Sequence, residues 1–190
     1  MRGGILVGTA LLLFAPPLPA EESPSPRLVL SFLGVAGQSF TLGADHGFAE
    51  LGGPVIEAGR LLPGWRVIAL DLCPMLISQP LTNSGAGRRS VYAVSLSLLL
   101  RQYFASAGSH VHPFVEIGGG PFDALHRVPA AGSRLNFFGQ AGLGLEVPLG
   151  PGWRGVAGYR FIHVSNGGFG PHNPSWNFNA LALGGRLLLP

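Results

Sequence analysis

His163 and Ser165 lie two residues apart in a segment that could carry out acyl transfer. The stretch from Tyr159 to Gly168 has the composition of a β-strand that runs into a glycine turn. Alternate side chains of a strand project from the same face, about 6.5–7 Å apart at Cα, so an imidazole can reach a hydroxyl. A base beside a hydroxyl nucleophile is the minimum for covalent ester hydrolysis. We therefore expect an esterase site; the alternative is a histidine at a strand end beside an ordinary turn.

Eight strands are predicted to position this pair. They span Arg27–Phe40, Phe48–Arg60, Trp65–Ser78, Ser90–Phe104, Val111–Phe122, Ser133–Leu149, Gly152–Asn166 and Trp176–Leu189. An even number of strands, each long enough to cross a bilayer at a tilt, is typical of a closed antiparallel barrel. The predicted fold is all-β, an eight-stranded antiparallel transmembrane β-barrel of the outer-membrane type.

The predicted connections alternate in length. Three are short, namely Leu61–Gly64, Ala105–His110 and Gly150-Pro151. Four are longer, namely Thr41–Gly47, Gln79–Arg89, Pro121–Gly132 and Gly167–Ser175. Outer-membrane barrels show this pattern, with short periplasmic turns and longer external loops, whereas a soluble β-sandwich has no reason to segregate loop length by end.

Residues of alternate parity differ in character along the predicted strands. In Ser133–Leu149 one parity is apolar or small: Leu135, Phe137, Gly139, Ala141, Leu143, Leu145 and Val147. The other parity carries polar groups and glycines that suit a narrow lumen. Two interfacial aromatic girdles are also expected. One contains Trp65, Trp153, Tyr103 and Phe104, and the other contains Phe40, Phe48, Phe122, Phe169 and Trp176.

The composition indicates an exported, apolar protein. Hydrophobic residues make up 47% of the chain and charged residues only 11%, where about 25% is usual. Residues 1–20 resemble a secretory signal peptide cleaved after Ala20, rather than a buried helix or an anchor, which leaves 21–190 as a single barrel domain. One cysteine allows no intrachain disulfide, and without lysine or a charge run nothing indicates a nucleic-acid partner.

Strand direction and phase place the His–Ser pair. With the amino terminus in the periplasm, odd-numbered strands run outward, so the seventh begins near Trp153 and ends externally. His163 and Ser165 share their parity with Trp153, whereas Arg154 and Arg160 have the other parity and belong in the lumen. The pair is therefore expected to face lipid at the level of the outer leaflet. Polar groups on such a surface cost free energy, which favours a functional role.

The stretch from Arg160 to Asn179 resembles the lipid A 3-O-deacylase (PagL) family. The resemblance is carried by His163-x-Ser165-Asn166-Gly167-Gly168, followed by His172-Asn173-Pro174 and a final strand. It implies an eight-stranded outer-membrane barrel that acts on lipid A of lipopolysaccharide among the outer-membrane lipids, without a metal or cofactor. It also implies His163 as the base, Ser165 as the nucleophile, Asn166 with the Gly167 and Gly168 amides as oxyanion donors, and Asn173 as a further binding residue.

One position departs from the family pattern. The acid that orients the histidine falls on Asn177, and no acidic residue follows Glu146. An amide can accept from the imidazole N–H but offers no charge to the imidazolium. Two functions therefore remain open: a lipid A deacylase-like serine esterase, or a weak or inactive barrel that binds lipid or a surface partner. A homodimer is left open as well.

Overall fold

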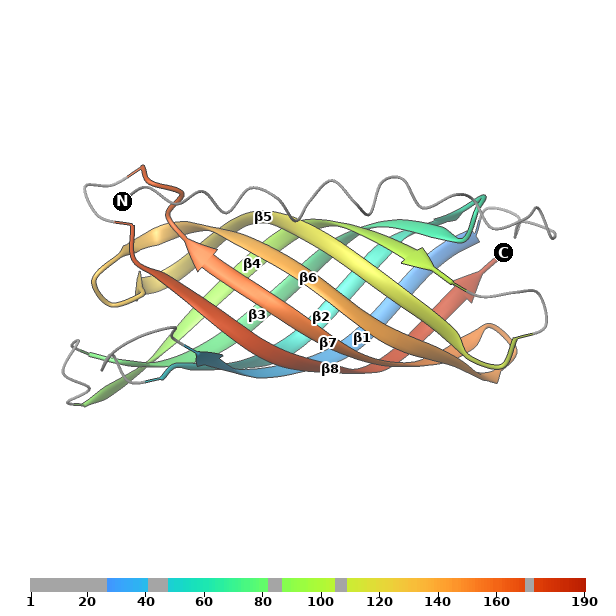
Figure 1. Cartoon of the computed structure of the whole chain (residues 1–190), viewed down its shortest axis with the longest axis horizontal. Coiled ribbons are helices and arrows are strands. Elements are labelled where there is room, and N and C mark those ends of the chain that lie inside the picture. The colour runs from blue at the N-terminus through green and yellow to red at the C-terminus, as the bar shows by residue number, and fades with distance from the viewer. Residues whose placement is uncertain (1–26, 41–47, 82–86, 105–108, 170–172) are drawn as a thin grey trace.

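Eight antiparallel strands form a closed barrel in the computed structural model, which describes residues 27–40, 48–81, 87–104, 109–169 and 173–190 (Figure 1). The strands are β1 (Arg27–Phe40), β2 (Glu50–Leu62), β3 (Arg66–Pro80), β4 (Arg88–Tyr103), β5 (His112–Val128), β6 (Ser133–Gly150), β7 (Trp153–Ser165) and β8 (Ser175–Leu189). Each pairs with the next, and β8 pairs with β1, which closes the sheet. The predicted eight-stranded antiparallel barrel is confirmed.

The fifth strand is longer than predicted, and the long connection expected at Pro121–Gly132 is wrong. β5 continues to Val128, leaving only residues 129–132 outside strands. Gly118, Gly119 and Gly120 lie inside this strand, as predicted, at a place where neighbouring backbones approach closely. A Cβ on Gly120 would lie 2.0 Å from the Leu96 carbonyl oxygen, so only glycine fits.

Several sequence predictions concern segments outside the described residues. These are the signal peptide 1–20, the connection Thr41–Gly47, and parts of the connections Gln79–Arg89, Ala105–His110 and Gly167–Ser175. No helix in the described ranges has the length and hydropathy that crossing a membrane would require.

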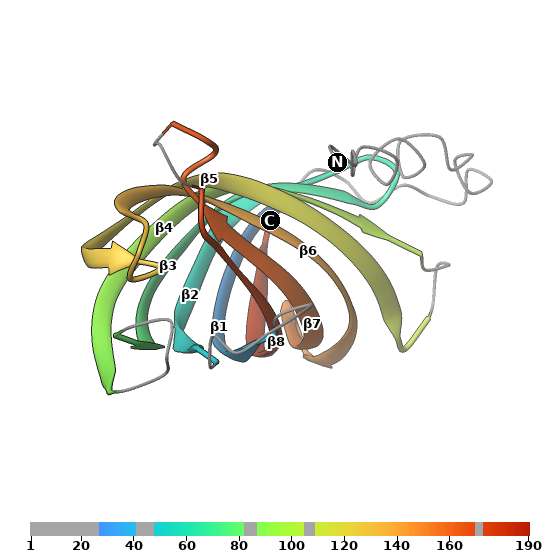
Figure 2. The same cartoon turned by 60° about the vertical axis from the view of Figure 1, so that its left-hand side comes forward.

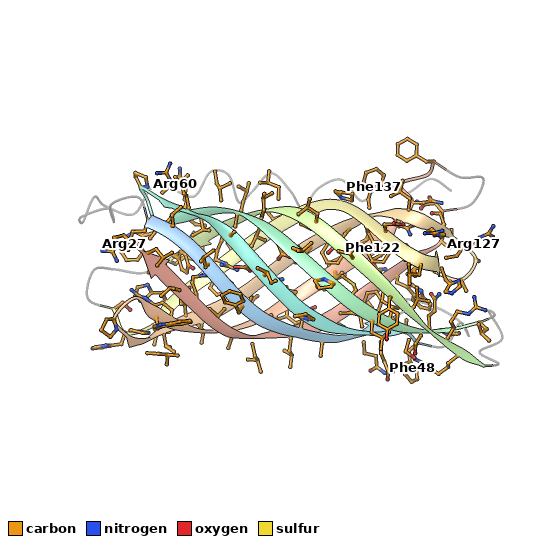
Figure 3. All side chains as sticks on the ribbon, turned by 180° about the vertical axis from the view of Figure 1, so that it is seen from behind. Arg27, Phe48, Arg60, Phe122, Arg127 and Phe137 are labelled. Atoms are coloured by element: carbon orange, nitrogen blue, oxygen red, sulfur yellow. The ribbon has the colours of Figure 1, made fainter. Side chains whose placement is uncertain are left out.

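The wall of the barrel sorts side chains by parity, as predicted. Apolar side chains cover the outside, where Leu135 is 67% exposed and Leu98 is 53% exposed. Figure 3 shows Phe137 on this outer surface near the external end. The aromatic girdle prediction is wrong for Tyr103, Phe122 and Trp176, because they have inward parity and are buried in the lumen. It is also wrong for Trp65, which packs against the buried core and the buried His112.

The lumen is filled by a network of ion pairs centred on Glu57. This carboxylate contacts Arg101 at 3.0 Å, Arg160 at 2.8 Å and Arg186 at 2.8 Å, and all four side chains are at most 3% exposed. Further carboxylates complete the network, from Asp71, Glu116 and Glu146. The prediction that Arg160 points into the lumen is confirmed. Such a filled interior fixes the strands rigidly, so the outer wall has a defined geometry on which a site can be built.

Candidate active site

The end of β7 and the start of β8 bring three predicted residues together. The register places His163 opposite Asn177 and Ser165 opposite Ser175. The Nε2 atom of His163 lies 2.9 Å from the Ser165 hydroxyl, and its Nδ1 atom lies 2.7 Å from Asn177 Oδ1. One imidazole therefore connects a hydroxyl to an amide oxygen, which is the geometry of a Ser-His-Asn triad.

The Asn177 contact determines which ring nitrogen carries the proton. An amide oxygen can only accept, so Nδ1–H of His163 donates to it. Nε2 of the neutral ring is then left with its lone pair directed at the Ser165 hydroxyl, which donates to it. This is the tautomer that a general base needs, because Nε2 can take the proton from the nucleophile.

The triad lies on the outer face of the wall. His163 and Asn177 are half-buried, and residues of the same parity on β7, such as Tyr159, are exposed. Arg160, of the other parity, is buried in the lumen. Ser165 is only 6% exposed although it has outward parity, and its register partner on β6 is the large side chain of Phe137.

The turn after Ser165 has the backbone conformation that glycine favours. Gly167 and Gly168 have φ angles of 66° and 83°, in the left-handed region. The Gly168 N–H donates to the Asn166 side-chain oxygen at 3.0 Å, and the Phe169 N–H donates to the Asn166 carbonyl at 3.2 Å. The Gly168 amide is thus already used inside the turn, whereas that of Gly167 has no such partner among the described residues.

Asn173, the other predicted binding residue, precedes β8 and is not hydrogen-bonded to the triad in the described part of the chain. Its side chain is exposed. A neighbouring feature was missed by sequence reasoning: the Tyr159 hydroxyl donates to Asn179 Oδ1 on the same outer face. Both residues share the parity of the triad, and this parity was the signal that could have found them.

Two aromatic pairs flank the triad on the outer wall. Phe137, which lies opposite Ser165 on β6, packs against Phe169 with ring centroids 5.7 Å apart. Phe40, which lies opposite Asn177 on β1, packs against Phe161 at 6.0 Å. The polar site therefore sits between apolar walls on a face that is apolar elsewhere. This surface suits a substrate with hydrocarbon chains.

The histidines and acids inside the barrel are engaged in other contacts. His112 packs edge-on against Trp65 and Tyr103, and Glu116 pairs with the lumen arginines. Across the described part of the chain, no three His, Cys, Asp or Glu side chains gather as a metal site would require.

Comparison with known proteins gives a family and a fold. The sequence model of the family described as "Lipid A 3-O-deacylase (PagL)" matches residues 75–186, more than half of the 190-residue chain. The match includes the whole triad. A search of curated proteins finds no match.

Two solved structures share the architecture. The Neisserial surface protein A (NspA) is 18% identical with a TM-score of 0.52, over 87% of this chain and 99% of that one. The outer membrane protein OprG from Pseudomonas aeruginosa is 11% identical with a TM-score of 0.51, over 88% and 97%. At these identities the likeness shows the fold alone, an eight-stranded barrel of the outer-membrane type.

Proposed function

Because the chain belongs to the lipid A 3-O-deacylase (PagL) family, we propose that it is an outer-membrane serine esterase that hydrolyses the 3-O-linked acyl ester of lipid A. The observation that supports this most strongly is the imidazole of His163, which bridges the Ser165 hydroxyl and the Asn177 amide oxygen. The proposal assigns Ser165 as nucleophile, His163 as general base and Asn177 as the residue that orients it.

The reaction follows from these contacts in two steps. The Ser165 oxygen attacks the ester carbonyl while His163 Nε2 takes its proton. The tetrahedral intermediate collapses, the bond to the sugar oxygen breaks, and the imidazolium returns the proton to that oxygen. A water molecule, activated by the same nitrogen, then hydrolyses the acyl-serine and releases the fatty acid. Asn177 holds Nδ1–H throughout and so keeps Nε2 directed at the reacting atoms.

The proposal assigns donors in the turn after Ser165 to stabilise the oxyanion of the tetrahedral intermediate. The Gly167 N–H is the first candidate donor, since the Gly168 N–H donates to Asn166 in the resting turn. Asn166, 7% exposed and adjacent to Ser165, is the second predicted contributor. Preorganised donors of this kind lower the barrier without a reorganisation cost at the moment of reaction.

The position of the site indicates where the substrate lies. Ser165 ends β7 at the external end of the barrel, and its side chain leaves the outer wall between aromatic pairs. A lipid of the outer leaflet can present an ester at this level without leaving the membrane. The proposal therefore includes an outer-membrane location, reached after export and cleavage following Ala20. Intact-mass measurement of the mature protein tests the cleavage site.

A second candidate function is favoured by Asn177, which stands where the family pattern has an acid. On this alternative the barrel binds lipid or a surface partner and turns over weakly or not at all. A serine-directed phosphonate separates the two functions. Labelling of Ser165 requires an activated hydroxyl, and protein that stays unlabelled while correctly folded would support the binding barrel.

The direct test is lipid A mass spectrometry from cells that express each variant. Ser165→Ala and His163→Ala should each abolish the loss of one hydroxyacyl chain that wild-type protein produces. Ser90→Ala, an exposed serine on β4, is the matched control and should retain activity. Undiminished deacylation in both site variants would disprove the assignments.

A further inference from the structure

A second polar feature lies at the external mouth of the barrel, in an open cleft of about 730 Å³. Arg89, Arg127, Arg134 and His126 line it, and they come from the ends of β4, β5 and β6. Figure 3 shows Arg127 at the end of the barrel opposite to Arg27 and Arg60. None of these side chains takes part in the proposed reaction.

The arginines of this cleft carry charge that the described residues do not neutralise. Arg89, Arg127 and Arg134 are exposed, and none forms a salt bridge with a described carboxylate. No aspartate or glutamate lines the cleft. Arg88 is different, because it pairs with Glu50 at 3.3 Å and lies over an aromatic ring. The three cleft arginines are thus available for an anionic ligand.

Hydrogen bonds from lining side chains also hold the cleft in shape. The Gln79 side chain, 1% exposed, forms part of its lining and donates to the Arg127 carbonyl at 2.6 Å. The Arg134 Nε donates to the Ala124 carbonyl at 2.9 Å, which leaves its two terminal nitrogens for other partners. These bonds hold the backbone of one arginine and the guanidinium of another in place. A guanidinium held in this way, as that of Arg134 is, suits the bidentate recognition of phosphate.

Two contacts connect the cleft to β8, the strand that carries Asn177. A Cβ on Gly132, a cleft residue, would lie 3.2 Å from Pro174, which directly precedes β8. The Trp176 indole N–H donates to Gln79 Oε1 at 3.4 Å. Figure 2 shows the β5–β6 hairpin close to the start of β8.

The distance between the cleft and Ser165 is short enough for a single lipid to contact both. Arg134 is three residues beyond Phe137 on β6, and Phe137 is the register partner of Ser165. At about 3.3 Å per residue, Arg134 lies roughly 10 Å from Phe137 along β6, and with a strand tilt of about 35–45° the cleft lies roughly 7–8 Å further outward than the catalytic serine. A lipid whose ester reaches Ser165 would therefore place its sugar headgroup at the level of the cleft.

We propose that this arginine cleft binds a phosphate group on the sugar headgroup of the glycolipid substrate. The inference rests on the proposed function for the identity of the substrate, but the cleft itself is argued from charge and geometry. Phosphate contacts would anchor the headgroup and so position the acyl ester at Ser165. The ligand class is a membrane-bound sugar phosphate, and free inorganic phosphate is the competing source of the same chemistry.

The test measures binding in the Ser165→Ala background, where no hydrolysis is needed. Refolded barrel in detergent micelles is titrated with phosphorylated lipid A, with the same lipid A after enzymatic dephosphorylation, and with inorganic phosphate. The cleft variant is Arg89→Gln/Arg127→Gln/Arg134→Gln. The matched control, Arg27→Gln/Arg60→Gln/Arg66→Gln, removes three exposed arginines from the opposite rim. Heat-modifiable gel migration verifies that each variant is folded.

The expected result is that the cleft variant binds phosphorylated lipid A at least about tenfold more weakly. Its affinity for dephosphorylated lipid A, and both affinities of the control variant, should stay unchanged. Equal losses for the two lipids, the same loss in the control variant, or inorganic phosphate bound as tightly as phosphorylated lipid A would each overturn the inference. If the arginine dependence holds while wild-type protein shows no deacylation, the cleft stands and the proposed function fails.

Discussion

Replacing Asn177 by aspartate should raise the turnover of the triad. The Asn177 oxygen is 2.7 Å from His163 Nδ1, and aspartate has the same shape, so the hydrogen bond is kept while a charge is added. That charge acts on the imidazolium that forms as His163 takes the proton of Ser165 in the transition state. The substitution therefore stabilises the transition state selectively.

The size of the effect can be bounded from the geometry. Opposite unit charges about 4 Å apart interact by about 4 kcal/mol at the effective dielectric constant typical near a protein surface. Each 1.36 kcal/mol corresponds to a factor of ten in rate, which sets an upper limit of about a thousandfold. The cost of holding a half-buried carboxylate on an apolar wall reduces this gain, so an increase of about ten- to hundredfold is expected. The loss of about 10⁴ seen when a serine protease triad acid becomes an amide includes a wrong tautomer, which the native Asn177 contact avoids.

The assay is the rate of hydroxyacyl release from lipid A by refolded barrel in micelles, followed by mass spectrometry. Asn179→Asp is the matched control: it adds the same charge two residues further along the outer face of β8, where the side chain bonds to Tyr159 instead of His163. Gel migration verifies that both variants fold. Turnover that falls in Asn177→Asp, or rises equally in Asn179→Asp, would show that Asn177 does not orient the base.

Two further substitutions test the catalytic turn and the stability of the barrel independently of each other. Gly167→Ala forces a side chain into a left-handed backbone position and 3.0 Å from the Phe137 ring, so hydroxyacyl release should fall at least about tenfold. Gly34→Ala, whose new Cβ would have no neighbour closer than 4.0 Å, should retain wild-type release, and equal rates for the two would contradict this. Glu57→Gln should lower the free energy of unfolding in urea by about 3 kcal/mol or more, because it leaves three buried arginines short of a partner. Glu50→Gln, at an exposed ion pair, should change it by less than about 1 kcal/mol, and matching midpoints would refute the role of the lumen network.

Side-chain parity was the part of this structure that sequence could predict well. Period-2 alternation put Leu135 outside and Arg160 inside, and the same count put His163, Ser165 and Asn177 on one outer face. These predictions succeed because a strand has only two faces, and because burying charge in lipid is costly enough to choose between them.

The contacts that each side chain makes inside the barrel could not be predicted from the sequence. Parity places Glu57 in the lumen, but its contact with Arg186 depends on the stagger of strands around the closed barrel. Local backbone bonds were equally hidden, such as the donation of the Gly168 amide to Asn166, since they depend on the dihedral angles of one turn. Trp176 was assigned to an aromatic girdle by its type and position alone, and it points inward instead.

Side chains on the outer wall form the candidate site, whereas a different set in the lumen stabilises the fold. On the wall, Ser165 and Asn177 are already hydrogen-bonded to His163, and the serine is 6% exposed, so the triad exposes little unpaired polarity to lipid. The fold instead depends on buried ion pairs in the lumen, such as Arg160 with Glu57. A change at position 177 can therefore alter the chemistry without endangering the barrel. Under the proposed function Asn177 takes the place of an acid, and this separation explains how that exchange leaves the fold intact.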